Sequence, residues 1–136
     1  MASLFTKIIR GEIPCHKLLE DDHFFAFLDV RPINPGHTLV VPKQETDYLF
    51  ELDSHLLSGI LPFSQKLIPA IEQVVPCKRV GLLVAGLEIP HAHIHLVPLI
   101  AEGDLTFERA QPADSETLKK LATQIRTKLN EPPTSP

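Results

Sequence analysis

The chain has 136 residues, of which 43% are hydrophobic and 22% are charged, and its formal net charge is −4. This length predicts a single domain with one hydrophobic core. The acidic balance argues against a protein that binds nucleic-acid backbones, since such proteins normally carry a basic surface, but it leaves room for a small anionic ligand.

No apolar run approaches the roughly 18 residues of a membrane span. The N-terminal residues also lack the apolar stretch of a signal peptide. The two cysteines, Cys15 and Cys77, belong to no CxxC pair. We therefore expect free thiols in a reducing compartment, and a cytoplasmic protein without a membrane partner.

The first part of the chain predicts one helix and three strands. A short helix with an apolar face follows Ser3, a candidate N-cap, and ends before Gly11. The alternation of apolar segments with turn residues then predicts an antiparallel meander of three strands, at residues 15–20, 23–30 and 37–41.

A long apolar periodicity predicts a helix over residues 53–75, with Asp53 as its N-cap. Pro62 lies inside this pattern and removes a backbone hydrogen bond, so we expect a kink or break near it. Residues 79–85 carry a continuous apolar run, which predicts a buried central strand, and residues 91–97 predict a fifth strand.

Residues 101–113 predict a loop, and residues 114–130 predict a last amphipathic helix. We expect the tail, residues 131–136, to be disordered. No repeat or long linker divides the chain, so residues 1–136 are expected to form one domain. Helices packed on an antiparallel sheet place the fold in the α+β class.

Three histidines alternate with apolar residues in the segment His91-Ala-His-Ile-His-Leu-Val97. Side chains two residues apart on a strand share a face, about 6–7 Å from one another. His91, His93 and His95 would therefore lie on one face of the sheet. The residues between them would face a core: Ala92, Ile94 and Leu96.

The spacing alone leaves three interpretations open. Two of the imidazoles could share a metal ion with a ligand from elsewhere, although three cannot easily converge on one ion from a straight strand. One neutral imidazole could instead act as a nucleophile while a protonated neighbour donates a proton. The third interpretation is a solvated polar face without a chemical function.

The segment matches, at every position, the His-φ-His-φ-His-φ-φ pattern (φ apolar) of the histidine triad (HIT) family. Phe27-Leu28-Asp29-Val30 and Gly36-His-Thr-Leu-Val-Val-Pro-Lys43 are similar to two other segments of that family. The resemblance covers about residues 3–99, and the C-terminal helix less closely. It extends to bacterial HIT and protein kinase C inhibitor-like nucleotide hydrolases.

The resemblance implies a HIT-like fold, in which a five-stranded antiparallel sheet carries packed helices. It also implies a homodimer, in which two such sheets meet as one ten-stranded sheet. No cofactor and no metal are implied for the chemistry. The implied ligand is a purine nucleotide similar to AMP.

The resemblance implies catalytic roles for four histidines. His93 would attack the α-phosphate and become nucleotidylated. The backbone carbonyl of His91 would accept a hydrogen bond from Nδ1–H of His93, which leaves Nε2 free. His95 would stabilise the phosphate charge. His37 would support the cluster from a neighbouring strand, or serve only as a structural histidine.

The resemblance also implies a nucleotide site. Asp29 would accept hydrogen bonds from the ribose hydroxyls. Backbone N–H groups of the loop that begins at Gly86 would face the phosphate, which fits the close approach that glycine permits. The expected nucleotide-binding residues are Leu4, Phe5, Ile8, Phe27, Leu28, Asp29, Val30, Gly86, Leu87, Glu88 and Ile89.

The implied activity is release of a nucleoside monophosphate from a phosphoramidate or a dinucleoside polyphosphate, through a covalent nucleotidyl-histidine. Three departures affect this expectation. Leu87 stands where many relatives carry glutamine, and the loop before it is shortened to Val84-Ala85-Gly86. Ser3 and Thr6 replace the cysteines with which some bacterial members bind structural zinc, so that site should be absent. The alternatives are a catalytically weak nucleotide-binding module and a metal-binding histidine strand.

Overall fold

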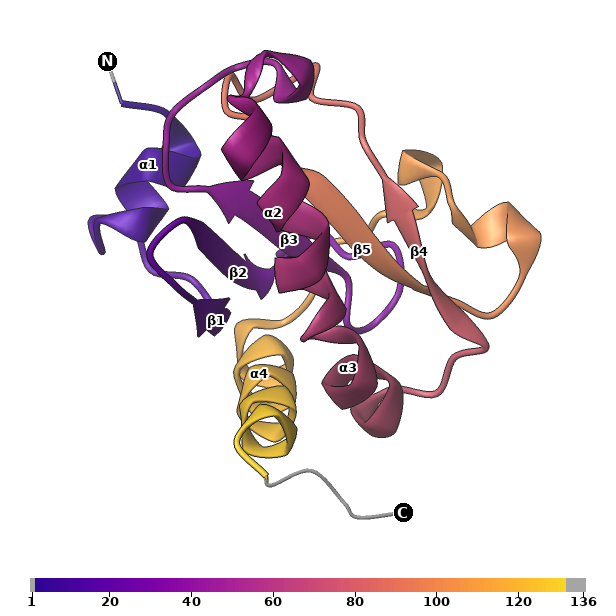
Figure 1. Cartoon of the computed structure of the whole chain (residues 1–136). Helices are drawn as coiled ribbons and strands as arrows, with labels where there is room; N and C mark the ends of the chain where they lie inside the picture. The colour runs from indigo at the N-terminus through magenta and orange to yellow at the C-terminus, as the bar shows by residue number, and fades with distance from the viewer. Residues whose placement is uncertain (1, 132–136) are drawn as a thin grey trace.

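The computed structural model describes residues 2–131 and contains one five-stranded sheet, with the strand order β1-β2-β3-β5-β4 (Figure 1). All four strand pairings are antiparallel. The α+β prediction is therefore confirmed. The expected disordered tail lies, from residue 132 onward, outside the described residues. The strands are β1 (Lys17–Glu20), β2 (Phe24–Leu28), β3 (Thr38–Pro42), β4 (Arg79–Leu83) and β5 (Ile94–Leu99).

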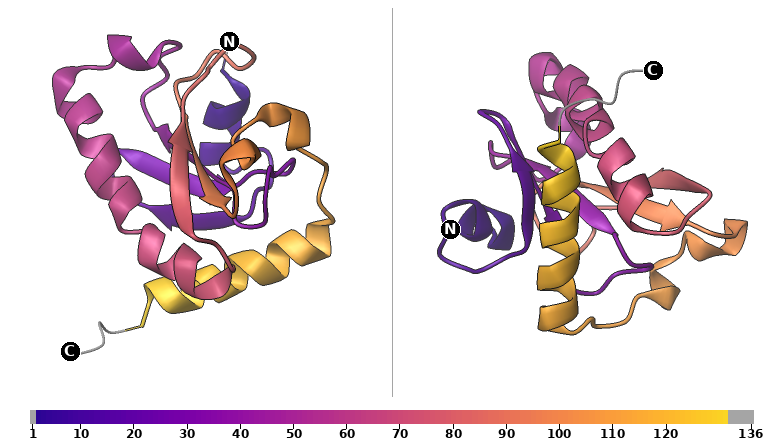
Figure 2. Two further views of the ribbon diagram at one scale, coloured as in Figure 1. Left: turned by 90° about the vertical axis from the view of Figure 1, so that its right-hand side faces the viewer. Right: turned by 90° about the horizontal axis from the view of Figure 1, so that it is seen from below.

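Helices cover both faces of the sheet (Figure 2). The short helix α1 packs on one face, where it buries Phe5 and Ile8 against Phe25 and Phe27 of β2. Three further helices pack on the opposite face, which holds the larger core. None of the helices described for residues 2–131 is long and apolar enough to cross a bilayer. The helices are α1 (Leu4–Ile9), α2 (Ser54–Gln65), α3 (Ile68–Val74) and α4 (Ser115–Leu129).

The predicted helix boundaries rest on caps that the structure contains. The Ser3 hydroxyl accepts from the N–H of Thr6 at 3.0 Å, which satisfies a free donor at the start of α1. Gly11 follows the C-cap of that helix with φ +80°, a conformation that favours glycine. Asp53 and Asp114 cap α2 and α4 in the same way.

The predicted helix over residues 53–75 does break, but not near Pro62. α2 continues through Pro62 and ends at Gln65, and α3 begins at Ile68 with Pro69 in its first turn. A proline ring clashes with the carbonyl four residues before it, so Pro69 prevents the helix from continuing past Gln65. In the first turn of α3 its missing N–H costs nothing.

Within the sheet of a single chain, the predicted central position of the apolar strand at residues 79–85 is wrong. β4 is an edge strand, and Leu82 is 44% exposed. The apolar run VGLLVA lacks the alternation that normally distinguishes a half-exposed strand from a buried one. β3 and β5 occupy the centre instead, because β3 joins the first hairpin to β5.

Two short 3₁₀ turns, at Glu102–Asp104 and Phe107–Arg109, interrupt the segment that was expected to be a plain loop. This segment connects β5 to α4. It brings the ring of Phe107 against His95.

Candidate active site

The first two histidines of the triad segment, His91 and His93, lie before β5, because that strand begins at Ile94 rather than at residue 91 as expected. The N–H of Ala92 donates to the carbonyl of Thr46 at 2.6 Å instead of entering the ladder. The backbone therefore departs from a straight strand just where the histidines begin.

The three histidines nevertheless alternate with core residues as predicted. Ala92, Ile94 and Leu96 all belong to the large core on the face that α2, α3 and α4 cover. The rings of His93 and His95 are closer than a straight strand would place them, with 4.9 Å between their centroids.

All three histidines are buried: His91 is 0%, His93 is 7% and His95 is 6% exposed. A solvated polar face is therefore the wrong interpretation. Burying three imidazoles without hydrogen bonds would be costly, so their partners indicate what they do.

His93 has one hydrogen-bond partner that fixes its tautomer. Its Nδ1 lies 2.8 Å from the carbonyl oxygen of His91, and a carbonyl only accepts, so Nδ1 carries the proton. A neutral His93 then has a free lone pair on Nε2. The ring of Phe5 in α1 packs edge-on against the ring of His93, with 4.9 Å between the two centroids.

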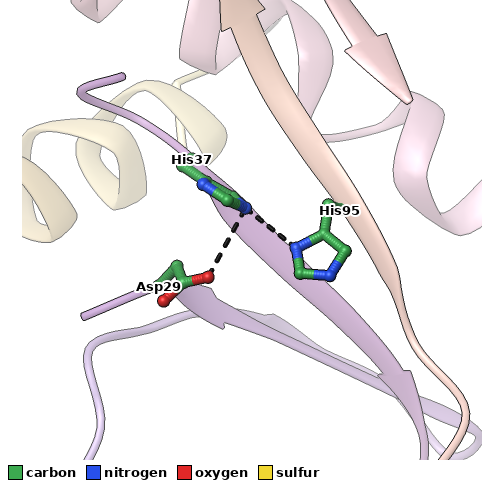
Figure 3. A group of neighbouring side chains, drawn as sticks. All are labelled: Asp29, His37 and His95. Atoms are coloured by element: carbon green, nitrogen blue, oxygen red, sulfur yellow. Dashed lines mark hydrogen bonds and ion pairs between the residues drawn. The ribbon is translucent and has the colours of Figure 1, made fainter. Parts of the chain in front are cut away.

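His37 lies directly before β3, and its ring touches His95 on the neighbouring strand β5. The N–H of Ile33 donates to Nδ1 of His37 at 2.9 Å, so the proton of a neutral His37 is on Nε2. That Nε2 lies 2.9 Å from Nδ1 of His95 and 3.5 Å from Oδ2 of Asp29 (Figure 3).

These contacts determine which nitrogen of His37 and of His95 donates a hydrogen bond and which accepts one. Since His37 donates through Nε2–H, Nδ1 of His95 accepts, and a neutral His95 carries its proton on Nε2. His95 can therefore donate a hydrogen bond to a ligand beside His93. The backbone of Ile33 thus determines, through His37, which atom of His95 is the donor.

Burial keeps these rings neutral. It lowers the pKa of His37, although the nearby Asp29 carboxylate opposes the shift. Burial together with the neighbouring His37 and His93 lowers the pKa of His95 to about 3. Burial also lowers the pKa of His91. Neutral rings can each both donate and accept, as the observed contacts require.

Asp29, His37 and His95 bring potential metal-ligating atoms within 4.8 Å of one another. The tautomers argue against a metal ion there. Nε2 of His37 must carry a proton as long as Ile33 donates to Nδ1, and a protonated nitrogen has no lone pair for a metal. The hydrogen bonds account for this cluster without an ion.

Some of the residues expected to bind a nucleotide lie together. Phe5, Ile8 and Phe27 form one buried cluster under α1, next to His93. Leu28 is a correction: its side chain is only 1% exposed and belongs to the core on the opposite face, because neighbouring residues of a strand alternate. Leu4 and Val30 are exposed and do not belong to this cluster.

The loop before the histidines leaves most of its side chains in solvent. Gly86 has φ +73°, Leu87 is 93% exposed, Glu88 is exposed, and Ile89 packs against the cluster under α1. This loop forms one wall of a pocket of about 270 Å³ that reaches His93. Tyr48 and Phe50 also line this pocket. The sequence does not single them out, because exposed aromatic residues outside a motif carry no signal.

Phe107 was also missed. It lies in the segment after β5, is 43% exposed, and packs edge-on against His95 with 4.9 Å between ring centroids. Asp104 anchors this segment: its carboxylate accepts from the N–H groups of Ile100 and Ala101 and from the side chain of Asn34. Phe107 stands in a stretch without apolar periodicity, so the sequence offered nothing to single it out.

Residues 10–101 match the model of the HIT domain family. Adenosine 5′-monophosphoramidase HNT1 of Saccharomyces cerevisiae is 33% identical over 131 residues, which cover 94% of this chain and 83% of the yeast protein. The chain therefore belongs to the HIT family.

Solved structures agree with this assignment. A HIT-like protein from Bartonella henselae superposes with a TM-score of 0.80 at 28% identity, covering 92% of this chain and 94% of the other. The histidine triad nucleotide-binding protein ST2152 from Sulfolobus tokodaii gives a TM-score of 0.81 at 28% identity, covering 92% and 90%.

Proposed function

We propose that this protein is a nucleotidyl hydrolase, which releases a nucleoside 5′-monophosphate from a phosphoramidate through a covalent intermediate on His93. The observation that carries the proposal is the hydrogen bond from Nδ1–H of His93 to the His91 carbonyl, because it leaves Nε2 free to attack. The yeast relative named as an adenosine 5′-monophosphoramidase supports the choice of leaving group.

The reaction has two steps. In the first, the Nε2 lone pair of His93 forms a bond to the α-phosphorus, the bond from phosphorus to the leaving nitrogen breaks, and the leaving amine takes up a proton from solvent. The ring of His93 is then cationic. Its Nδ1–H bond to the His91 carbonyl strengthens as that charge develops. In the second step water attacks phosphorus and releases a proton to solvent, the bond to Nε2 breaks so that His93 is neutral again, and the monophosphate leaves.

His95 and His37 stabilise the charge on the phosphate. Nε2–H of His95 is the donor that faces the ligand, and His37 holds it in that tautomer. Because both rings are buried, a hydrogen bond to the developing charge is stronger than it would be in water. His93, His95, His91 and His37 thus form one functional unit.

The nucleoside lies, in this proposal, on the α1 side of the sheet. Phe5, Ile8 and Phe27 offer an apolar wall to a purine base. The carboxylate of Asp29 accepts from the ribose hydroxyls. Backbone N–H groups of the loop at Gly86 contact the phosphate.

We further propose that the chain acts as a single domain and pairs as a homodimer through β4. An edge strand presents unpaired backbone groups that favour pairing with another strand. Two exposed apolar residues, Leu82 of β4 and Val84 directly after it, support an interface at this edge of the sheet. Two sheets joined there would form one sheet of ten strands.

The experiment is AMP release from adenosine 5′-phosphoramidate in EDTA, comparing wild type with His93→Ala. We expect release by the wild type, loss of release in the variant, and a nucleotidyl adduct on the wild-type protein by intact mass spectrometry. His23→Ala, at an exposed histidine, is the matched control and should retain activity. Binding of AMP without turnover in the wild type would contradict the proposal and favour the binding-module alternative.

A dinucleoside polyphosphate is the second candidate substrate. The observation that favours it is the pocket beside His93, since about 270 Å³ can hold a leaving group larger than ammonia. Turnover of diadenosine tetraphosphate at a higher kcat/KM than the phosphoramidate would select this candidate.

A further inference from the structure

Three side chains from distant parts of the chain gather around the first histidine of the triad, His91. We call Ser3, Thr6, Glu45 and His91 the N-terminal clip. Ser3 Oγ lies 2.7 Å from Nδ1 of His91. A carboxylate oxygen of Glu45 accepts from the N–H of Ser3 and from the hydroxyl of Thr6, both at 2.6 Å.

The donors and acceptors of the clip can be assigned completely. Nε2 of His91 lies 2.7 Å from the carbonyl of Pro42, so Nε2 carries the proton of the neutral ring. Nδ1 of His91 must then accept. Thr6 is committed to Glu45, so the hydroxyl of Ser3 is the donor to His91. The other possible acceptor for the Ser3 hydroxyl, the Thr6 hydroxyl, is farther away at 3.2 Å.

Ser3 is itself held in place. Its Oγ accepts from the N–H of Thr6, and its own N–H donates to Glu45. Ser3 is 7% exposed, so water does not readily replace it as the partner of His91. Hydrogen bonds from the Thr6 hydroxyl and from the N–H of Ser3 lower the pKa of Glu45 to about 2, so the carboxylate stays charged at neutral pH.

The N-terminal clip is connected to the nucleophile, His93, through His91. The imidazole of His91 is fixed at both nitrogens, and its backbone carbonyl is the acceptor for Nδ1–H of His93. A ring that cannot rotate restricts the backbone to which it is attached. The orientation of that carbonyl determines the tautomer of His93, because no other contact of Nδ1 is available among the hydrogen bonds of the described residues.

We propose that Ser3 is a positioning residue for the nucleophile: its hydroxyl, held by Glu45 and Thr6, fixes His91 so that the His91 carbonyl keeps the proton of His93 on Nδ1. The consequence for the reaction rests on the proposed function. The effect on the tautomer of His93 does not, and can be measured in the absence of any substrate.

The test uses Ser3→Ala, which removes the hydroxyl, and Ser3→Thr, which retains it. Ser58→Ala, at an exposed serine of α2, is the matched control. The first readout is the ¹⁵N NMR spectrum of the histidine side chains. We expect His93 to be the Nδ1–H tautomer in the wild type, a mixture of tautomers in Ser3→Ala, and the wild-type tautomer in Ser3→Thr and Ser58→Ala.

The second readout is AMP release from adenosine 5′-phosphoramidate. We expect kcat of Ser3→Ala to fall about tenfold while KM changes less than twofold, because the nucleophile and not the nucleotide site is altered. Ser3→Thr should recover most of this loss. Glu45→Ala, at an exposed position, should give a smaller loss in the same direction.

The two readouts separate the inference from the proposed function. Absence of AMP release by the wild type would contradict the proposed function, while the NMR comparison would still decide the inference. An unchanged His93 tautomer in both Ser3→Ala and Glu45→Ala would overturn the inference. So would a loss of thermal stability in Ser3→Ala without any change in tautomer or kcat, because that result indicates a merely structural serine.

Discussion

The ring of Phe107 stands edge-on to the imidazole of His95, with 4.9 Å between the ring centroids. This contact brings the segment between β5 and α4 to the histidine cluster. The segment is held at its far end as well, since the N–H of Ala113 donates to the carbonyl of Val30 at 3.0 Å. One side of the site is therefore built by this segment and not by the sheet.

We predict that Phe107 selects the leaving group. Phe107→Ala should lower kcat/KM about tenfold for an adenosine phosphoramidate with an aromatic amine, since an apolar contact of this size contributes roughly 1–3 kcal/mol to discrimination. The effect on adenosine 5′-phosphoramidate, whose leaving group is ammonia, should be less than threefold. Equal losses on both substrates would contradict the prediction.

Acid should destabilise the folded protein through His95. Its pKa is about 3 in the folded state, whereas an unfolded histidine has a pKa of about 6.5. Between these values the unfolded chain binds a proton that the folded chain does not, so stability falls as the pH is lowered from 6.5. One such group contributes at most about 1.4 kcal/mol per pH unit.

Urea unfolding of wild type and His95→Asn at pH 7.0 and pH 5.0 checks this prediction. The wild type should lose more stability between the two pH values than the variant, by up to about 2 kcal/mol. His23→Asn, at an exposed histidine, should lose as much as the wild type. The same loss in His95→Asn as in the wild type would assign the acid sensitivity to other groups.

Gly36, the residue before His37, should not tolerate a side chain. It has φ +92°, and a Cβ there would lie 3.1 Å from both Pro98 and Val75. Gly36→Ala should therefore lower the free energy of unfolding by about 1–3 kcal/mol. Gly103→Ala is the matched control, because a Cβ at Gly103 meets nothing within 4 Å. Equal stabilities of the two variants by urea unfolding would show that the turn at Gly36 adapts.

The proposed dimer should dissociate when a charge is placed on its edge strand. Leu82 of β4 is 44% exposed, and a lysine there would be buried against the partner's strand. Light scattering should give about twice the 15.2 kDa chain mass for the wild type and the single mass for Leu82→Lys. Leu87→Lys, at the 93% exposed loop residue, should remain a dimer. A wild-type monomer would contradict the proposed interface.

The fold and the histidine cluster were predictable because their signals are local. Caps such as Ser3 and Asp53 bind backbone N–H groups a few residues away, so the starts of α1, α2 and α4 could be located, whereas α3, which has no side-chain cap, could not. The alternation of His93 and His95 with apolar residues specified which side chains share a face. The position of β4 could not be predicted, since strand order depends on which strands meet across long connections.

Contacts between distant segments account for the rest of the site. Phe107 reaches His95 only because Asp104 anchors the segment after β5. Ser3 reaches His91 across 88 positions of the chain. Neither contact leaves a periodic pattern in the sequence, so neither could be predicted from local sequence patterns.

The central pairing of β3 with β5 has a consequence for folding. His37 and His95 are separated by 58 positions in the chain, yet they meet at the middle of the sheet. Contacts between such distant residues form slowly, because a long loop must close before they yield any stabilisation. During refolding, helical signal should therefore recover first, and the ability to bind nucleotide should return only with the slowest phase.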